Sequence, residues 1–300
     1  MLERISFDRG LHLRGTQLWL DAERRRELCV LTSLAMGLPP VHDRSFATSS
    51  AVEALRRAGF KGQLMPTAFE RWVTVAGVEF QLLPTPGPLG PAVVLINSGG
   101  ERILVTGLVR AQPASLPRDI DLLVATVPAL EQRGATLERT LKGLDLFCEQ
   151  AASEGARATV LCGSLEAATE LFAAMWERGR TPRALGLLAR LTSDRQGASA
   201  KLAVGTWDAR VGANTRVAWV DCGLMTWRQA RGERAQPQAT FRLRWYADWA
   251  MLQQVVAATT ARQVALIGAG STARAQAARK LGSSVETRFL GNSRQLTLTS

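Results

Sequence analysis

Histidine, the side chain that most often holds catalytic metals and moves protons, occurs only twice in this chain, as His12 and His42. A hydrolase with a dinuclear metal site needs several imidazoles to hold its ions, so the count alone excludes that class. A serine hydrolase built on a Ser–His pair would have to use one of the two. His42 follows Pro39-Pro40 with no GxSxG motif nearby, so we expect it to be an exposed loop residue. We predict no metal and no cofactor.

Two further motifs carry little chemistry. The four cysteines have no CxxC spacing, which indicates neither a zinc site nor a disulfide framework. Gly268, Gly270 and Ala273, with Glu286 further on, match a dinucleotide-binding fingerprint. That fingerprint opens a nucleotide-binding unit, and only 14 residues remain after Glu286. We therefore interpret this motif as a glycine-rich strand-to-helix turn without a ligand.

Charge is more informative. The chain has 37 basic residues, 33 of them arginines, and a net charge of +11, which favours polyanionic partners. Coding bias toward arginine is the alternative explanation. The basic residues are interleaved with aromatic ones in a pattern that can hold single-stranded nucleic acid. However, alternation of Phe241, Leu243 and Trp245 with arginines also fits a half-buried strand with a solvated basic face. The candidate binding residues are Arg228, Arg231, Arg234, Arg242, Arg244 and Trp245.

Hydrophobic patterning predicts the elements that position these residues. Short strands dominate the first part, with a hairpin over 11–21, a strand at 27–33, a helix over 49–60 and three strands between 71 and 108. A strand at 120–129 leads into an α/β segment with helices over 137–153 and 165–178, then a looser stretch to about 214. The chain closes on a strand, a helix and a strand. No apolar run reaches the ~18–20 residues of a membrane span, and no apolar leader is present, so we expect a cytoplasmic protein without membrane contact.

In this order, the strand ends resemble the metallo-β-lactamase/β-CASP nucleases, most closely the DNA-ligase-associated exonuclease-like branch. GLHLRGTQLWLDA is similar to that family's opening hairpin, and VLTSLAMGLPP to the segment that carries its His-x-His-x-Asp-His signature. The hairpin ending in LVTGL, the stretch RLRWYADWAML and the closing VALIGAGSTARAQAARKLG continue the resemblance. It implies an α/β fold, namely a four-layer αββα sandwich over residues 1–127 and 215–300 with a β-CASP-like α/β insertion over 128–214.

The resemblance also implies that the metal ligands are gone. Asp21 stands at the family's first aspartate, and Asp248 is retained as well, but both are explained as turn or cap residues. The other ligand and motif positions carry side chains without an imidazole or a carboxylate, so a zinc pair cannot assemble on them. These positions are Ser33, Ala35, Gly37, Leu38, Pro88, Leu108, Ala125, Tyr246 and Gly268.

We therefore expect a catalytically inactive relative of these nucleases that acts in DNA or RNA processing. Two roles remain open, binding of nucleic acid and service as a non-catalytic partner of an active paralogous nuclease or a DNA-repair factor. A protein–protein scaffold that never touches nucleic acid would fit the eight tryptophans equally well. An active hydrolase with a relocated site has no supporting cluster of residues.

Overall fold

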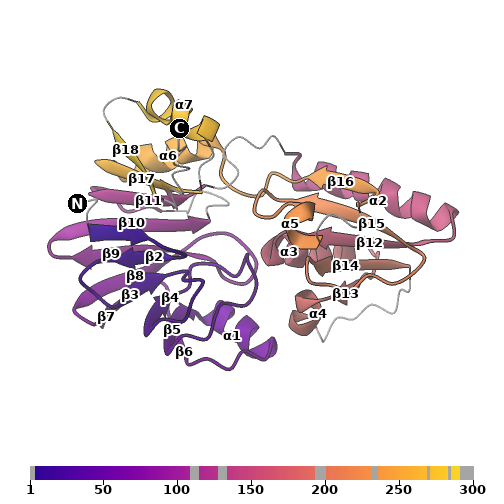
Figure 1. Cartoon of the computed structure of the whole chain (residues 1–300), viewed down its shortest axis with the longest axis horizontal. Coiled ribbons are helices and arrows are strands. Elements are labelled where there is room, and N and C mark those ends of the chain that lie inside the picture. Colours follow the sequence, from indigo (N-terminus) through magenta and orange to yellow (C-terminus); the bar gives the residue numbers. More distant parts are fainter. Residues whose placement is uncertain are drawn as a thin grey trace, which may run out of the picture.

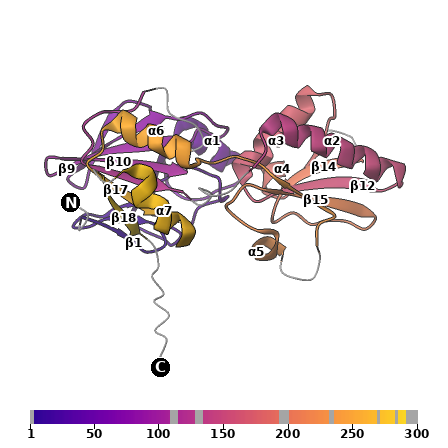
Figure 2. The ribbon, with the colours of Figure 1, turned by 90° about the horizontal axis from the view of Figure 1, so that it is seen from above.

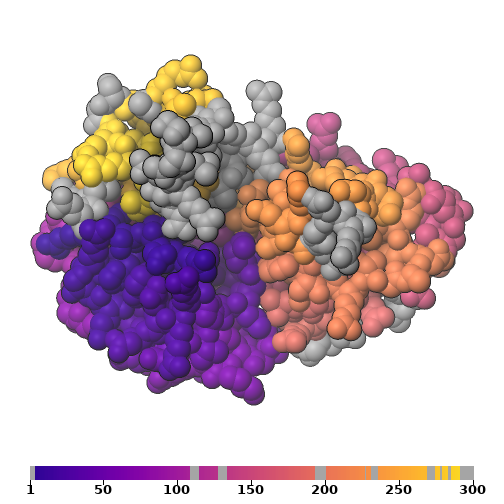
Figure 3. Space-filling model, viewed as in Figure 1, coloured from indigo at the N-terminus to yellow at the C-terminus, as the bar shows by residue number. Residues whose placement is uncertain are grey.

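A computed structural model describes residues 4–108, 115–127, 134–192, 201–231, 236–268, 271–282 and 285–290. Its backbone forms three β-sheets and seven helices within those ranges, which confirms the expected α/β class. Figure 1 shows the first two sheets together on one side of the molecule and the third sheet on the other. In the space-filling view of Figure 3 the two parts lie in contact side by side.

The first two sheets pack face to face. The first sheet has the order β1-β2-β3-β4-β5-β6, and the second β18-β17-β11-β10-β9-β8-β7. Leu20, Leu82 and Val124 belong to the apolar core between them. The first-sheet strands are β1 (Ile5–Phe7), β2 (Leu11–Leu13), β3 (Leu18–Leu20), β4 (Leu28–Val30), β5 (Arg44–Thr48) and β6 (Leu64–Thr67). The second-sheet strands are β7 (Trp72–Val75), β8 (Val78–Pro84), β9 (Ala92–Ser98), β10 (Glu101–Leu108), β11 (Leu122–Thr126), β17 (Gln263–Ile267) and β18 (Glu286–Leu290).

Helices cover the outer faces of this pair of sheets. α6 (Trp249–Thr259) and α7 (Ser271–Leu281) pack on the second sheet through Leu252 and Ala277. α1 (Ser49–Arg57) packs on the first sheet through Leu55. The layers therefore run from α6 and α7 through the second and first sheets to α1, and the second sheet is buried on both faces.

The third sheet has the order β13-β14-β12-β15-β16, with all strands parallel. Its strands are β12 (Arg157–Cys162), β13 (Arg183–Leu185), β14 (Leu202–Thr206), β15 (Thr215–Asp221) and β16 (Ala239–Arg242). The helices of this part are α2 (Leu137–Ser153), α3 (Leu165–Glu177), α4 (Leu187–Leu191) and α5 (Trp227–Arg231). Figure 2 shows α2 and α3 on one side of the strands and α5 on the other.

The domain boundary expected after residue 214 falls inside this third sheet. β15 follows that boundary, yet it pairs with β12 from Thr215 opposite Arg157 to Val220 opposite Cys162. Ala218 and Val220 complete the apolar core under α2 and α3, which is why the strand joins this sheet. The inserted unit therefore extends through β16, and the closing part begins only at the segment that leads into α6.

The predicted strands occur in the predicted order, but β1, β5 and β6 were not predicted, and two further predictions were wrong. The run predicted as a single strand at 71–83 is a hairpin, because Ala76 and Gly77 both take positive φ angles and turn the chain between β7 and β8. The stretch to 214 predicted as loose contains β13, α4 and β14. Its glycines and arginines weaken the apolar periodicity on which the prediction depended.

Candidate functional site

The segment that follows β4 occupies the place where the resemblance put a metal signature. Asp21, at the end of β3, accepts a hydrogen bond from the backbone N–H of Thr32 at 2.7 Å and another from its hydroxyl. Asp21 as a residue is exposed, but desolvation of its carboxyl, opposed by the Thr32 hydrogen bonds, raises its pKa to about 6. Its φ of +47° is that of a turn residue, so Asp21 holds the turn, as expected for a surviving acid.

Ser33 is joined to a buried carboxylate that the sequence analysis missed. The Ser33 hydroxyl donates to Glu166 Oε1 at 2.7 Å, and the Leu34 backbone N–H reaches the same oxygen at 3.3 Å. Glu166 lies in the first turn of α3 and is only 1% exposed. Because 133 residues separate the two partners, only the S-x-E cap pattern at 164–166 could have drawn attention to it. Without an imidazole between them, this pair ties the segment to α3 rather than forming a nucleophile and base.

The next positions of the segment are taken up by packing. The Ala35 carbonyl accepts the Leu165 backbone N–H at 2.8 Å, and the Ala35 side chain is fully buried. Gly37 has a φ of +95°, and a Cβ there would meet the Trp207 ring at 3.3 Å. Leu38 is 38% exposed. Three of the four signature positions are thus engaged with the third-sheet part, and the fourth faces solvent.

Tyr246 and Leu108 also contact the third-sheet part of the molecule. The Tyr246 hydroxyl lies 2.9 Å from the Ser164 hydroxyl, and Ser164 is the N-cap of α3. Leu108, at the end of β10, packs against the same apolar core as Tyr246 and Ala35. The structure therefore brings Ser33, Ala35 and Tyr246 together around the start of α3, and Leu108 packs against the core under α2 and α3.

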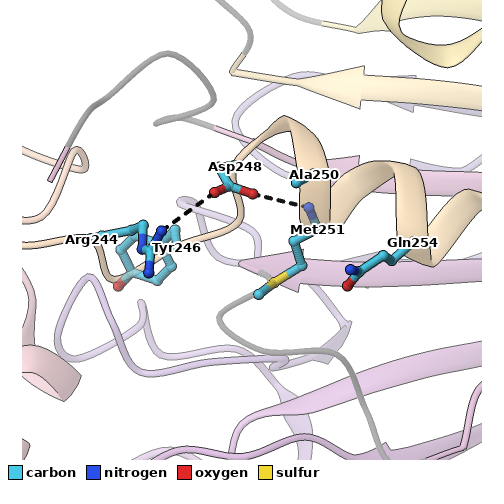
Figure 4. Close-up of a pocket in the computed structure, with 6 residues that line it drawn as sticks. All are labelled: Arg244, Tyr246, Asp248, Ala250, Met251 and Gln254. Atoms are coloured by element: carbon cyan, nitrogen blue, oxygen red, sulfur yellow. Dashed lines mark hydrogen bonds and ion pairs between the residues drawn. The ribbon is translucent and has the colours of Figure 1, made fainter. Parts of the chain in front are cut away.

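A pocket of about 360 Å³ is formed by α6 and the segment that leads into it. Figure 4 shows its six lining residues, with Asp248 between Arg244 and the backbone of Met251. Asp248 is the N-cap of α6 and accepts the Met251 N–H at 3.0 Å, as expected for a cap, and Arg244 lies 4.0 Å from its other oxygen. The cation and the anion of the pocket, Arg244 and Asp248, already pair with each other, and the lining has no side chain that would act as a nucleophile. Its lining residues are Arg244, Tyr246, Asp248, Ala250, Met251 and Gln254.

The other positions that the resemblance singled out, Pro88, Ala125 and Gly268, lie in or next to strands of the second sheet. Pro88 is partly buried in the loop before β9, whose Gly90 carbonyl accepts the Thr48 hydroxyl at α1. Ala125 is buried within β11 under the α6 and α7 layer. Gly268 follows β17 with a φ of +78°. Glu286 begins β18 and accepts a hydrogen bond from Gln263, whereas Gly270 and the side chain of Ala273 lie outside the described residues.

Both histidines lie in the first-sheet part, and the expectation for His42 was wrong. His42 does lie in a loop, but it is 1% exposed, and its Nδ1 accepts the Arg26 backbone N–H at 3.1 Å. Burial and the neighbouring Arg26 charge lower its pKa, and Asp43 opposes them. His12 stacks on Trp19 at 4.3 Å, and the Arg26 guanidinium covers Trp19 at 3.5 Å. Neither imidazole stands near the start of α3.

Metal and thiol chemistry find no support in the described part of the chain. No three His, Cys, Asp or Glu side chains come together there in a group that could hold an ion. Burial raises the pKa of Cys29 to about 12 and of Cys148 to about 11, and it raises the pKa of Cys162 and Cys222 further. Protonated thiols are poor nucleophiles and poor ligands.

The predicted nucleic-acid residues divide into exposed and buried ones. Arg228, Arg242 and Arg244 are exposed, whereas Arg234 and the side chain of Arg231 lie outside the described residues. Trp245 is 4% exposed and packs in the core under the third sheet, so it cannot stack on a base without repacking. The half-buried interpretation of this segment is therefore the right one for Trp245.

Comparisons with known proteins give the fold and little else. No family model and no curated protein matches the chain. A crystal structure of a protein of unknown function from Enterococcus faecalis V583 is similar in fold, with a TM-score of 0.53 and 10% sequence identity. The match covers 88% of this chain and 79% of that protein's chain. In the described ranges, no helix combines the length and apolarity needed to cross a membrane.

Proposed function

We propose that this chain is a non-catalytic relative of the metallo-β-lactamase/β-CASP nucleases that binds nucleic acid. The layer order, two face-to-face sheets between α1 on one side and α6 and α7 on the other, supports that relationship. An α/β unit inserted between β11 and α6 supports it further.

The observation that carries the non-catalytic part is the Ser33–Glu166 hydrogen bond. In this proposal the signature segment has exchanged metal ligation for attachment to α3. A hydroxyl and a backbone N–H donate hydrogen bonds to this buried carboxylate. The segment keeps a defined conformation in this way without an ion.

Nucleic-acid binding is supported by charge rather than by aromatic stacking. Arg228 and Arg242 are exposed, and the net charge of +11 attracts a phosphate backbone. Since Trp245 is buried, the contacts we propose are electrostatic, and the affinity should fall steeply with salt.

Fluorescence anisotropy of a labelled single-stranded oligonucleotide, at several salt concentrations, tests the proposal. We expect sub-micromolar binding at low salt, and the R228Q/R242Q variant should lower the slope of log K against log salt by about 1.4. The R56Q/R71Q variant, which removes two exposed arginines of the other part, is the matched control and should keep the slope. Two tightly bound zinc ions per chain, or cleavage of labelled DNA or RNA, would contradict the non-catalytic assignment.

A second candidate role, a scaffold for an active nuclease, is favoured by one observation. The segment between β4 and β5 exposes Met36 at 52%, Leu38 at 38% and Val41 at 51%. Apolar side chains exposed together are typical of interface centres. Titration of an intact nuclease of the same family against the M36S/V41S variant and the unchanged chain distinguishes this role, because only a scaffold should lose affinity for the nuclease.

A further inference from the structure

The edge strands of the three sheets differ in how well they are protected against pairing with another chain. An unpaired edge is usually blunted by shortness, by proline or by charge. β1 and β13 have only three residues, β6 carries Pro66, and β16 and β18 carry Arg242, Glu286 and Arg288. β7 has four residues, and none of them is a proline or a charged residue. Among the edges that the structure describes, β7 is therefore the one without such protection.

The hairpin of β7 and β8 fixes which backbone groups face the open edge. Both residues of its turn have positive φ angles, so the turn closes on Val75 and Val78 as a hydrogen-bonded pair. Hydrogen-bonded and non-hydrogen-bonded pairs alternate along an antiparallel ladder. The N–H and C=O groups of Trp72 and Thr74 therefore point away from β8, toward an edge where no described strand pairs with them.

The side chains at this edge are largely apolar and exposed. Val73 and Val75 pack against the core between the first two sheets. Trp72 and Thr74 alternate with them and therefore lie on the opposite face of the second sheet. Trp72 is 42% exposed, and Phe69, which forms a bridge with β8, is 41% exposed. Figure 1 shows β7 at the end of the two-sheet part that lies away from α6 and α7. An exposed indole beside an unpaired edge is typical of a protein–protein contact.

The local charge allows two copies of this chain to meet at β7. Each copy carries a net charge of +11, so two copies repel each other. Residues 62–100, which include β7, contain only three charged side chains, and two of them, Glu70 and Glu79, are acidic. The third, Arg71, is exposed and forms no ion pair with a described residue. The formal charge of this stretch is −1, so the repulsion between two copies is weak here.

We propose that two copies of this chain associate through β7, as antiparallel partners related by a two-fold axis at Val73. Glu70 and Ala76 have positive φ angles, so the extended part of the edge is the stretch 71–75, and Val73 is its midpoint. A shift of the register by two residues would bring Glu70 or Ala76 into the ladder. A shift by one would place core-facing side chains opposite outward-facing ones. A second copy matches the alternation of this edge by symmetry.

The pairing uses the backbone groups and covers the apolar side chains of the edge. Each Trp72 forms a hydrogen-bonded pair with the partner's Thr74, which satisfies the N–H and C=O groups that face the edge. The two Val73 side chains meet as a non-hydrogen-bonded pair next to the core. The contact is smaller than a standard interface, so we expect a dissociation constant of about 10 μM. This association does not depend on the nucleic-acid binding proposed above.

Sedimentation equilibrium of the full chain, from about 1 to about 200 μM, tests the proposal. We expect the mass to rise with concentration from that of one chain toward that of two. Thr74→Lys places a cation at the edge and should weaken the association by about 10-fold or more. Thr240→Lys makes the same change at an exposed position of another edge strand, β16, and should associate like the unchanged chain. Thr74→Pro removes an N–H that faces the edge and adds no charge, and it should weaken the association as well.

Engineered cysteines test the register. The Cα atoms of a non-hydrogen-bonded pair lie about 4.5 Å apart, which is within the range of a disulfide. Val73→Cys should therefore give a covalent dimer under mild oxidation. Val75→Cys should not, because the proposed register places it opposite Arg71. The unchanged chain, whose cysteines are buried or partly buried, gives the background.

The outcomes that would overturn the proposal are distinct. A chain that stays monomeric at the highest concentration overturns it. A dimer that Thr74→Lys and Thr240→Lys weaken equally would show that β7 is not the contact. A covalent dimer of Val75→Cys but not of Val73→Cys would overturn the proposed axis. Both threonines are exposed, so we expect both lysine variants to melt like the unchanged chain, which excludes misfolding as the cause of any difference.

Discussion

The second sheet and the third sheet use their two faces differently. The second sheet packs against the first sheet on one side and against α6 and α7 on the other, so both faces serve stability. The third sheet packs α2 and α3 on one face, and a smaller apolar cluster around Leu161 and Trp219 lies on its other face. Most of the positions where the resemblance placed a metal site lie in well-packed parts, whereas Leu38 and Gly268 are exposed.

The largest expected effect is the loss of free energy of unfolding when a fully buried leucine is truncated, compared with a partly buried one. Leu82 is fully buried between the first two sheets, whereas Leu185 is only partly buried at the edge of the cluster around Leu161 and Trp219. Leu82→Ala should lower the free energy of unfolding by about 3–4 kcal/mol, from lost burial and the remaining cavity, and Leu185→Ala by about 1 kcal/mol. Urea denaturation of both variants measures the difference. Equal losses would mean that Leu185 is packed as tightly as Leu82.

Gly107 and Gly212 differ in how closely other residues pack around their backbone. Gly107 has a φ of +57°, and a Cβ there would lie 2.3 Å from the Thr32 hydroxyl oxygen, whereas a Cβ on Gly212 would meet nothing within 4 Å. Gly107→Ala should therefore cost about 2–3 kcal/mol, because it combines backbone strain with a clash. Gly212→Ala should be neutral or stabilise by about 0.5 kcal/mol through the unfolded chain. Thermal melting of both variants is sufficient, and a loss at Gly212 would contradict the open surroundings.

Local patterns were predictable from the sequence, and contacts between distant segments were not. The helix over 137–153 was predicted with its observed bounds, because Thr136 caps it and its apolar residues recur at helical spacing. The assignment of β15 and β16 to the third sheet was missed because strand order depends on packing partners far away in the chain. The Glu166 carboxylate was missed for the same reason. The burial of His42 was missed because its loop contacts Arg26, 16 residues earlier in the chain.

The Ser33–Glu166 contact supplies the next prediction. Ser33→Ala removes one hydrogen bond from a buried carboxylate and the acceptor of the Ala35 N–H, so we expect a loss of about 1–2 kcal/mol. In a Glu166→Gln background the same change should cost less, since the charge that strengthens the bond is gone. Denaturant unfolding of the four chains gives the coupling energy, and Ser153→Ala at an exposed helix end is the control. A coupling energy of zero would remove the basis for attachment of the segment to α3.

The smallest expected effect is the pH dependence of stability that arises from the buried His42. Burial and Arg26 lower the pKa of His42 below its usual 6.5. As the pH falls below 6.5, the unfolded chain therefore binds a proton on this ring more readily than the folded chain. The contribution of neutral His42 to the free energy of unfolding is complete above pH 6.5 and is lost as the pH falls below that value. The slope is at most about 1.4 kcal/mol per pH unit. His42→Asn keeps an acceptor in place of Nδ1 and should flatten this dependence, whereas His12→Gln should preserve it. Since the chain has only these two histidines, an unchanged slope in His42→Asn would show that the packed interior tolerates the charged ring.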